Sequence, residues 1–198
     1  MKSFIYTRPE ALTPDLCNSL ITQYEQHKDT LAAPAVFESD DGKKHNTAVC
    51  DSVDIGIWPY LLEDPSWNPI LTEVYDIIDR EERNYRHTYR GMKAVGKLRR
   101  VDNSVLIKYE PGGAHHAWHC ERGSYVNSDR VLTWMIYLND VTDEGGTAFY
   151  YQDHVESAQQ GKLVMWSSEW MHLHKGVISP TQEKYIMTGW FEFDTDND

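Results

Sequence analysis

The spacing of hydrophobic positions predicts two amphipathic helices in the first half of the chain. Apolar residues recur at helical intervals over residues 16–24 and again over residues 70–78. Each run follows a proline, Pro14 or Pro69, that suits the first turn of a helix, and Thr13 stands where an N-terminal cap is expected. We therefore expect helices that start near residues 14 and 69.

The second half of the chain has the pattern of strands instead. Short apolar runs occupy residues 105–109, 130–138, 147–151, 162–166 and 184–193. Turn-forming residues separate these runs, as in an antiparallel sandwich or jelly roll. Helices first and strands afterwards indicate an α+β fold in which the N-terminal helices pack on one sheet.

Three further segments are less regular. Residues 2–7 alternate weakly and predict an edge strand. Residues 32–44 contain Pro34 and the turn pair Asp41-Gly42, and they predict a polar loop that is either a substrate lid or simply loose. Residues 80–90 are polar and predict a solvated face at the end of the second helix.

No composition shift or linker divides the chain. Its 198 residues are enough for one domain with a real core. We expect a single domain over residues 1–198, with N-terminal helical support over about residues 1–100 and the jelly-roll core over about residues 100–193.

Charge and cysteine content narrow the class of protein. The 31 acidic and 19 basic residues give a net charge of −12, which argues against a general nucleic-acid binder. No apolar run approaches the roughly 20 residues that span a membrane, and the N-terminal residues do not resemble a secretory signal. Cys17, Cys50 and Cys120 have no metal-site or redox spacing, so we expect free thiols in a reducing, cytoplasmic location.

The stretch over residues 109–121 contains the strongest candidate chemistry. His119 and Glu121 stand two apart in a segment that we expect to be a strand, so both side chains would point to one face. An imidazole, a carboxylate and a second histidine from the later stretch 171–176 would leave one face of a metal open, which suits Fe(II) oxygenase chemistry. His172 and His174 would share a strand face, so spacing alone leaves the second histidine open.

Lys184 begins the last apolar run, ten residues after His174. A buried lysine at this place would need an anionic partner, because an uncompensated buried charge is costly. A dicarboxylate co-substrate would supply that anion. An ordinary lysine at an exposed strand end would need none.

Several ordered blocks resemble the prolyl 4-hydroxylase-like Fe(II)/2-oxoglutarate dioxygenases. The core block is RVLTWMIYLNDVTDEGGTAF at residues 130–149, and residues 161–166, 174–180 and 184–190 continue the pattern in order. The resemblance covers roughly residues 100–193 and implies a double-stranded β-helix. It also implies Fe(II), 2-oxoglutarate and O2, with ascorbate as a further reductant, and hydroxylation of a substrate with release of succinate and CO2.

The resemblance assigns roles residue by residue. It implies that the iron ligands are His119, Glu121 and His174. It implies that the C5 carboxylate of 2-oxoglutarate is held by Lys184, with hydrogen bonds from Tyr109 and Thr133. It implies that His116, Trp118, His172 and Trp190 lie along the substrate site or just behind the ligands. This chain departs from the pattern in carrying Glu121 in place of an aspartate and one extra residue between Tyr109 and His119.

The resemblance favours a peptidyl proline as the substrate, and a protein or peptide over a small molecule. Trp118, Tyr125, Trp170 and Trp190 could form an aromatic groove for an extended segment. The alternatives are a hydroxylase of a small molecule or another side chain, a cupin-like metal-binding protein or zinc hydrolase, and a binding module without catalysis. Nucleic-acid and membrane partners are not expected.

Overall fold

The large sheet is antiparallel and contains the strands that the second half of the chain predicts. The computed structural model describes residues 3–39 and 42–194. Its large sheet runs in the order β1 (Tyr6–Arg8), β11 (Leu163–Ser167), β8 (Arg130–Tyr137), β13 (Lys184–Phe193), β7 (Ser104–Tyr109), β5 (Val53–Ile57) and β2 (Ala33–Pro34), while β6 (Leu98–Arg100) pairs with the end of β13.

A smaller antiparallel sheet lies over the large one. Its order is β10 (His154–Glu156), β9 (Thr147–Phe149) and β12 (His174–Gly176). A separate hairpin pairs β3 (Phe37–Ser39) with β4 (Gly42–Lys44). Short 3-10 helices occupy η1 (Pro59–Leu62), η2 (Arg90–Ala94), η3 (Tyr125–Asn127) and η4 (Trp170–His172).

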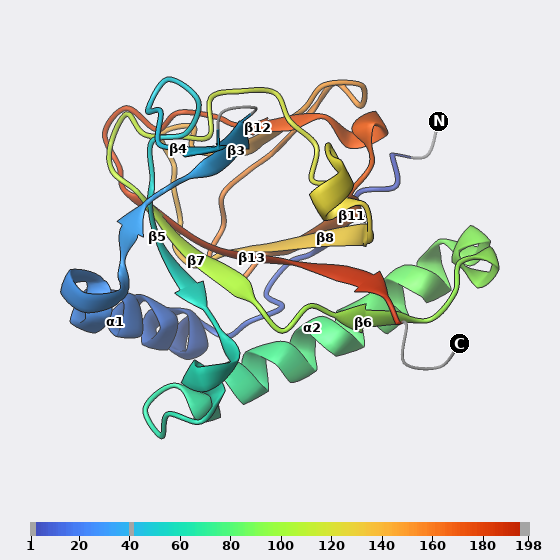
Figure 1. The fold of residues 1–198 in the computed structure, drawn as a ribbon, viewed down its shortest axis with the longest axis horizontal. Helices are drawn as coiled ribbons and strands as arrows, with labels where there is room; N and C mark the ends of the chain where they lie inside the picture. The colour runs from blue at the N-terminus through green and yellow to red at the C-terminus, as the bar shows by residue number, and fades with distance from the viewer. Residues whose placement is uncertain (1–2, 40–41, 195–198) are drawn as a thin grey trace.

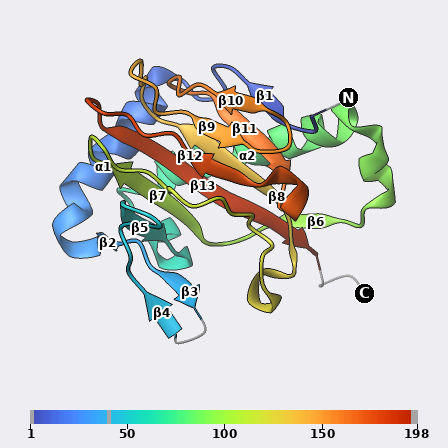
Figure 2. The ribbon, with the colours of Figure 1, turned by 90° about the horizontal axis from the view of Figure 1, so that it is seen from above.

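Two long helices cover the other face of the large sheet. The helix α1 (Pro14–Leu31) begins after Thr13, whose hydroxyl accepts a hydrogen bond from the Leu16 amide at 3.2 Å. The helix α2 (Asn68–Thr88) has its proline in the first turn, as predicted. Figure 1 shows both helices below the large sheet, and Figure 2 shows the smaller sheet on the opposite side. No helix among the described residues is long and apolar enough to cross a lipid bilayer.

Alternation along the central strands divides the core into two layers. On β8, the side chains that face the helices are Leu132, Trp134 and Ile136. The intervening Met135 and Tyr137 pack toward the smaller sheet. The predicted helices on one sheet and the jelly-roll strands are therefore confirmed, and the space between the two sheets is left for a site.

The edge strand predicted over residues 2–7 is confirmed only at its end, because Tyr6 and Thr7 belong to β1, which pairs with β11. The loop predicted over residues 32–44 is wrong, since β2 and the β3–β4 hairpin lie there; Asp41 of the predicted turn is outside the described residues. Its strands are too short for an alternating pattern to stand out. The part before residue 100 also supplies β5 and β6 to the large sheet, so it is more than a helical support.

The solvated face predicted for residues 80–90 is partly wrong. Glu81 and Glu82 are 1% and 9% exposed. Tyr6 donates a hydrogen bond to Glu81 at 2.7 Å, and Arg86 pairs with Glu82. A run of charged residues predicts exposure, but Glu81 and Glu82 are buried and each has a hydrogen-bonding or ionic partner. Proteins tolerate buried charged groups when they are paired in this way.

Gly189 makes room for a tryptophan of the large sheet. It lies opposite Trp134 across β13 and β8, and a Cβ at Gly189 would meet the indole Cζ2 at 2.5 Å. Trp134 is fully buried and cannot move aside without disturbing the helix-facing core.

We expect Gly189→Ala to lower the free energy of unfolding by about 1–3 kcal/mol, the usual cost of overpacking a core. Chemical denaturation measures it. Gly91→Ala is the matched control, because nothing lies within 4 Å of a Cβ at Gly91. Equal stability of the two variants would contradict this account.

Candidate metal centre and cavity

Two histidines from distant segments meet through their backbones. His119 lies between β7 and β8, and His174 begins β12. The His119 amide donates to the His174 carbonyl at 3.0 Å, and the His174 amide donates back at 2.9 Å. The strand predicted over 119–121 is wrong, because this single bridge is its only ladder contact and Glu121 begins a turn.

The two histidines and Glu121 nevertheless converge on one point. Glu121 Oε1 lies 3.4 Å from His119 Nε2 and 3.4 Å from His174 Nε2. One ligand atom from each of the three residues lies within 4.8 Å of the others. This is a set of two imidazoles and one carboxylate that could hold a metal ion.

Backbone carbonyls orient both imidazole rings. His119 Nδ1 lies 3.1 Å from the Ala117 carbonyl, and His174 Nδ1 lies 2.9 Å from the His172 carbonyl. A carbonyl oxygen only accepts, so each Nδ1 carries the proton and each Nε2 keeps its lone pair for a metal. The protein thus holds both rings in the tautomer that metal binding requires.

The charge state of the cluster also suits a cation. Burial opposes ionisation of Glu121, but the neighbouring His119 and His174 hold the pKa of its carboxyl well below the usual value. Burial and the neighbouring His119 lower the pKa of His174, whereas burial of His119 is outweighed by the Glu121 carboxylate, which raises the pKa of that histidine. Metals bind the carboxylate and the neutral imidazoles, so a bound cation would take the place of the proton that Glu121 favours on His119.

The second oxygen of Glu121 is held by two residues that the sequence did not connect to it. Trp190 Nε1 donates to Glu121 Oε2 at 2.9 Å, and Arg130 Nη1 donates to the same oxygen at 3.3 Å. The Arg130 guanidinium stacks 3.6 Å from the centre of the Trp190 ring. The longer side chain of glutamate is therefore fixed at its far end. Trp190 was predicted to line the site, whereas Arg130 was missed.

A cavity of about 680 Å³ opens between the two sheets beside this cluster. That volume suits a small-molecule or peptide side-chain site. Its lining includes the three cluster residues together with Asp54, Tyr109, His115, Arg130, Lys184 and Trp190. The candidate ligands and Lys184 thus share one space.

Lys184 is buried without an anion. It is 4% exposed, and its Nζ donates to the Gly145 carbonyl at 2.8 Å and lies 4.8 Å from the centre of the Tyr109 ring. No carboxylate of the described residues forms an ion pair with it. Burial lowers the pKa of Lys184 to about 8. Such a group is costly unless something negatively charged enters the cavity.

Tyr109 lies beside Lys184, whereas Thr133 lies opposite Trp190, far along β13 from Lys184. Tyr109 is the cross-strand partner of Lys184 and lines the cavity. Burial, with smaller effects of Cys50 and Asp54, raises the pKa of Tyr109 well above its usual value, so its hydroxyl stays protonated and can donate. Thr133 is 1% exposed, bonds the Ser168 hydroxyl at 2.9 Å, and is not part of the cavity lining.

The three other histidines near the candidate ligands differ in whether they reach the cavity. His115 lines the cavity and its ring lies 3.7 Å from that of His119, whereas His116 is not part of the lining. Burial lowers the pKa of His115 to about 4, so it is neutral. His172 is buried outside the ligand cluster, with Nε2 3.0 Å from the Ser3 carbonyl. Adjacent histidines have no distinguishing signal in the sequence, so only the fold identifies His115.

Trp118 and Cys120 flank His119. Trp118 is 40% exposed, meets Tyr150 edge-on at 5.1 Å, and carries Lys175 Nζ 4.9 Å above its ring. Cys120 is a half-buried free thiol that lines the cavity together with its neighbours His119 and Glu121. The missing strand geometry explains this, because side chains alternate strictly only in a regular strand.

Comparison with known proteins agrees with the geometry. Residues 104–192 match the family model of the 2OG-Fe(II) oxygenase superfamily. No curated protein sequence matches the chain significantly.

Similar solved structures include a Pseudomonas putida prolyl-4-hydroxylase, with 17% identity, 96% of this chain and 93% of that chain covered, and a TM-score of 0.66. A viral collagen prolyl hydroxylase from Paramecium Bursaria Chlorella virus-1, in its 2OG complex, has 16% identity, 96% and 97% coverage and a TM-score of 0.68. A Trichoplax adhaerens prolyl hydroxylase, in complex with a hypoxia inducible factor peptide fragment, has 11% identity, 96% and 84% coverage and a TM-score of 0.74.

At these identities the solved structures establish the fold, and the family match adds the chemistry. The matched segment contains the three-residue cluster and Lys184. Residues 104–192 match the 2OG-Fe(II) oxygenase superfamily, and this match together with the cluster supports a 2-oxoglutarate-dependent dioxygenase with the double-stranded β-helix fold seen in the prolyl hydroxylases.

Proposed function

We propose that this dioxygenase hydroxylates a proline in a peptide or protein, and that Fe(II) binds His119, Glu121 and His174. The observation that carries the proposal is the pairing of two features in one cavity. A three-donor cluster is oriented for a metal, and a buried Lys184 has no anionic partner among the described residues. Fe(II) and 2-oxoglutarate would satisfy both.

The ligand cluster fits Fe(II) because its donors are two imidazoles and one carboxylate on one side of the cavity. When bound, Fe(II) would supply the oxidation of a C–H bond by O2 as 2-oxoglutarate becomes succinate and CO2. The protein holds one oxygen of Glu121 through Trp190 and Arg130 and fixes both imidazole tautomers, so the site is oriented before the metal arrives.

Lys184 is proposed to bind the C5 carboxylate of 2-oxoglutarate, with Tyr109 as its hydrogen-bonding neighbour. The same role for Thr133, which the resemblance implies, does not fit, because Thr133 lies opposite Trp190 and outside the cavity lining. An ammonium and a carboxylate form a strong, charge-assisted hydrogen bond in a buried place. Such a contact would orient the co-substrate along the cavity toward the metal cluster. The Tyr109 ring beneath the ammonium also favours the charged form of the lysine.

An aromatic run beside the cavity supports a proline-containing substrate. Trp118 contacts Tyr150, Tyr150 contacts Tyr151, and Tyr151 contacts Trp170, with centroid distances of 5.1, 5.1 and 6.0 Å. All four rings are 40–60% exposed, and Trp118 adjoins His119. Extended proline-rich segments dock on exposed aromatic surfaces. The structural neighbour with a bound hypoxia inducible factor peptide fragment is a prolyl hydroxylase of the same fold.

Of the four residues that the resemblance assigns to the substrate region, Trp190 lines the cavity and Trp118 belongs to the exposed aromatic run, whereas His116 and His172 lie outside the lining. Trp190 holds Glu121 from the cavity side and is the strongest of them. We also propose that residues 1–198 form one domain and work in the cytoplasm, where the three free thiols stay reduced.

The test is oxidation of proline-containing peptides by the purified chain with Fe(II), 2-oxoglutarate and O2. We expect iron-dependent succinate formation together with peptides that gain one oxygen atom, measured by mass spectrometry. Ascorbate is proposed as a reductant, so sustained turnover should fall when ascorbate is left out of the reaction. Succinate without any oxidised peptide would contradict the proline substrate. Tightly held zinc without 2-oxoglutarate binding would contradict the assignment of the site.

A further inference from the structure

One charged side chain in the cavity has no part in the chemistry described so far. The charged residues that line the cavity, apart from histidines, are Asp54, Glu121, Arg130 and Lys184. Glu121 binds Arg130 at 3.3 Å and faces the proposed metal. Lys184 has its partner in the co-substrate of the proposed function. Asp54 is left over.

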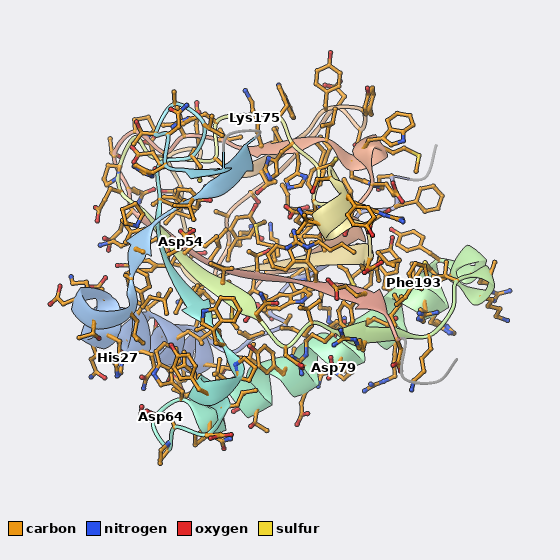
Figure 3. The ribbon with its side chains drawn as sticks, viewed as in Figure 1. His27, Asp54, Asp64, Asp79, Lys175 and Phe193 are labelled. Atoms are coloured by element: carbon orange, nitrogen blue, oxygen red, sulfur yellow. The ribbon has the colours of Figure 1, made fainter. Side chains whose placement is uncertain are left out.

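Asp54 lies on the cavity side of β5. The side chains of Ile55, the next residue of the strand, and of Ile57 are fully buried in the core layer that faces the helices. Because strand side chains alternate, Asp54 points the other way and lines the cavity. It pairs with Ile107 of β7 and lies close enough to Tyr109 to affect that hydroxyl. Figure 3 shows Asp54 above α1 and below Lys175 of the smaller sheet.

The carboxylate of Asp54 has little compensation. The Ser52 hydroxyl donates to Asp54 Oδ1 at 2.7 Å, and no cationic side chain of the described residues pairs with Asp54. Burial raises the pKa of Asp54 to about 6, so the group is largely ionised at neutral pH. A carboxylate in such surroundings is stabilised strongly when a cation or charged donor enters beside it.

We infer that Asp54 is a specificity-determining residue that binds the cationic side chain of a lysine or arginine in the substrate peptide, near the oxidised residue. The inference rests on the proposed function, because it takes the occupant to be a peptide. The net charge of −12 points the same way, since it attracts cationic peptides over long range. A substrate side chain with only neutral hydrogen-bond donors would leave the negative charge of Asp54 uncompensated.

Binding and turnover of matched peptides test this inference. A fluorescent proline-containing peptide is prepared in versions that carry lysine or glutamine at each position flanking the proline. Binding is measured by fluorescence polarisation with Mn(II) and 2-oxoglutarate present, and oxidation is measured separately with Fe(II). We expect one lysine version to bind the natural chain about 10- to 100-fold more tightly than its glutamine partner.

Asp54→Asn should remove that difference by weakening the lysine peptide alone. Asp51→Asn is the matched control, because Asp51 is exposed and outside the cavity lining, and it should keep the preference. For the natural chain, the preference should also shrink as salt is added. This measurement needs no variant, so a poorly folded Asp54→Asn protein would not end the test.

The outcomes separate the two proposals. Equal binding of the lysine and glutamine peptides by the natural chain would overturn the role of Asp54, and so would a lysine preference that survives Asp54→Asn. A preference that depends on Asp54 without any oxidised peptide would uphold Asp54 and refute proline hydroxylation. Oxidation of the lysine and glutamine peptides with equal KM would uphold proline hydroxylation and refute the role of Asp54.

Discussion

His174→Ala is expected to remove metal binding and 2-oxoglutarate turnover, whereas His172→Ala keeps both. His174 supplies one of the three donors, and two donors on one side hold a divalent ion poorly. Changes to residues that merely support a ligand already cost about 10- to 100-fold in affinity or activity, so loss of a ligand should cost more. His172 contributes its backbone carbonyl to the His174 ring, and this carbonyl remains in the alanine variant.

The measurements are the metal content after incubation with Fe(II) or Co(II) and the rate of succinate formation. His172 is buried, so the thermal midpoint of each variant accompanies the metal data to separate misfolding from ligand loss. A folded His174→Ala protein that still binds one equivalent of metal would refute the assigned ligand set. Loss of metal from His172→Ala but not from His174→Ala would mean that His172 is the ligand in place of His174.

Lys184→Met is expected to weaken 2-oxoglutarate binding by about 10- to 100-fold, the value of a charged hydrogen bond in a buried site. Methionine keeps most of the length and removes the charge. The same change should leave the folded state at least as stable, because the ammonium has no anionic partner among the described residues and its burial is unfavourable. Calorimetric titration and thermal unfolding measure the two effects.

A co-substrate analogue provides the control for Lys184. The five-carbon keto acid 2-oxopentanoate lacks the C5 carboxylate, so its affinity should be the same for the natural chain and for Lys184→Met. An equal loss of affinity for both keto acids would mean that Lys184 shapes the cavity and does not bind the carboxylate.

The same lysine predicts a pH dependence. Burial lowers the pKa of Lys184 from 10.5 to about 8 in the folded chain, so the free site loses its proton as the pH rises above about 8. The affinity for 2-oxoglutarate should then fall by up to about tenfold per pH unit, and Lys184→Arg should flatten this decline. Between about pH 8 and 10.5 the unfolded chain binds more protons at this residue, so its contribution to stability rises with pH in that window.

Local patterns were sufficient for the elements that carry long, regular signals. Thr13, Pro14 and the apolar spacing of α1 specify a helix without reference to the rest of the chain, since caps and amphipathic faces are local properties. The long strands β8 and β13 were predicted for the same reason. The strands β5 and β6 and the β3–β4 hairpin were missed, because pairing with neighbouring strands rather than a local apolar pattern forms them.

The candidate ligands were also within reach of the sequence. His119 and Glu121 stand at a fixed short spacing, and the resemblance placed His174 and Lys184 at the right intervals behind them. The strand that this spacing predicted over residues 119–121 was wrong. The segment is a bridge followed by a turn, yet the side chains still converge because the backbone of His119 pairs with that of His174.

The sequence by itself therefore determined the class of fold, the resemblance to the 2-oxoglutarate dioxygenases and the residue types of the site. Only the tertiary structure decided which neighbours act together: His115 rather than His116 in the cavity, and Asp54 on its wall. Arg130 and Trp190 meet Glu121 across 9 and 69 positions. The physical reason is that contacts of this kind depend on long-range strand pairing and side-chain direction, which no local spacing encodes.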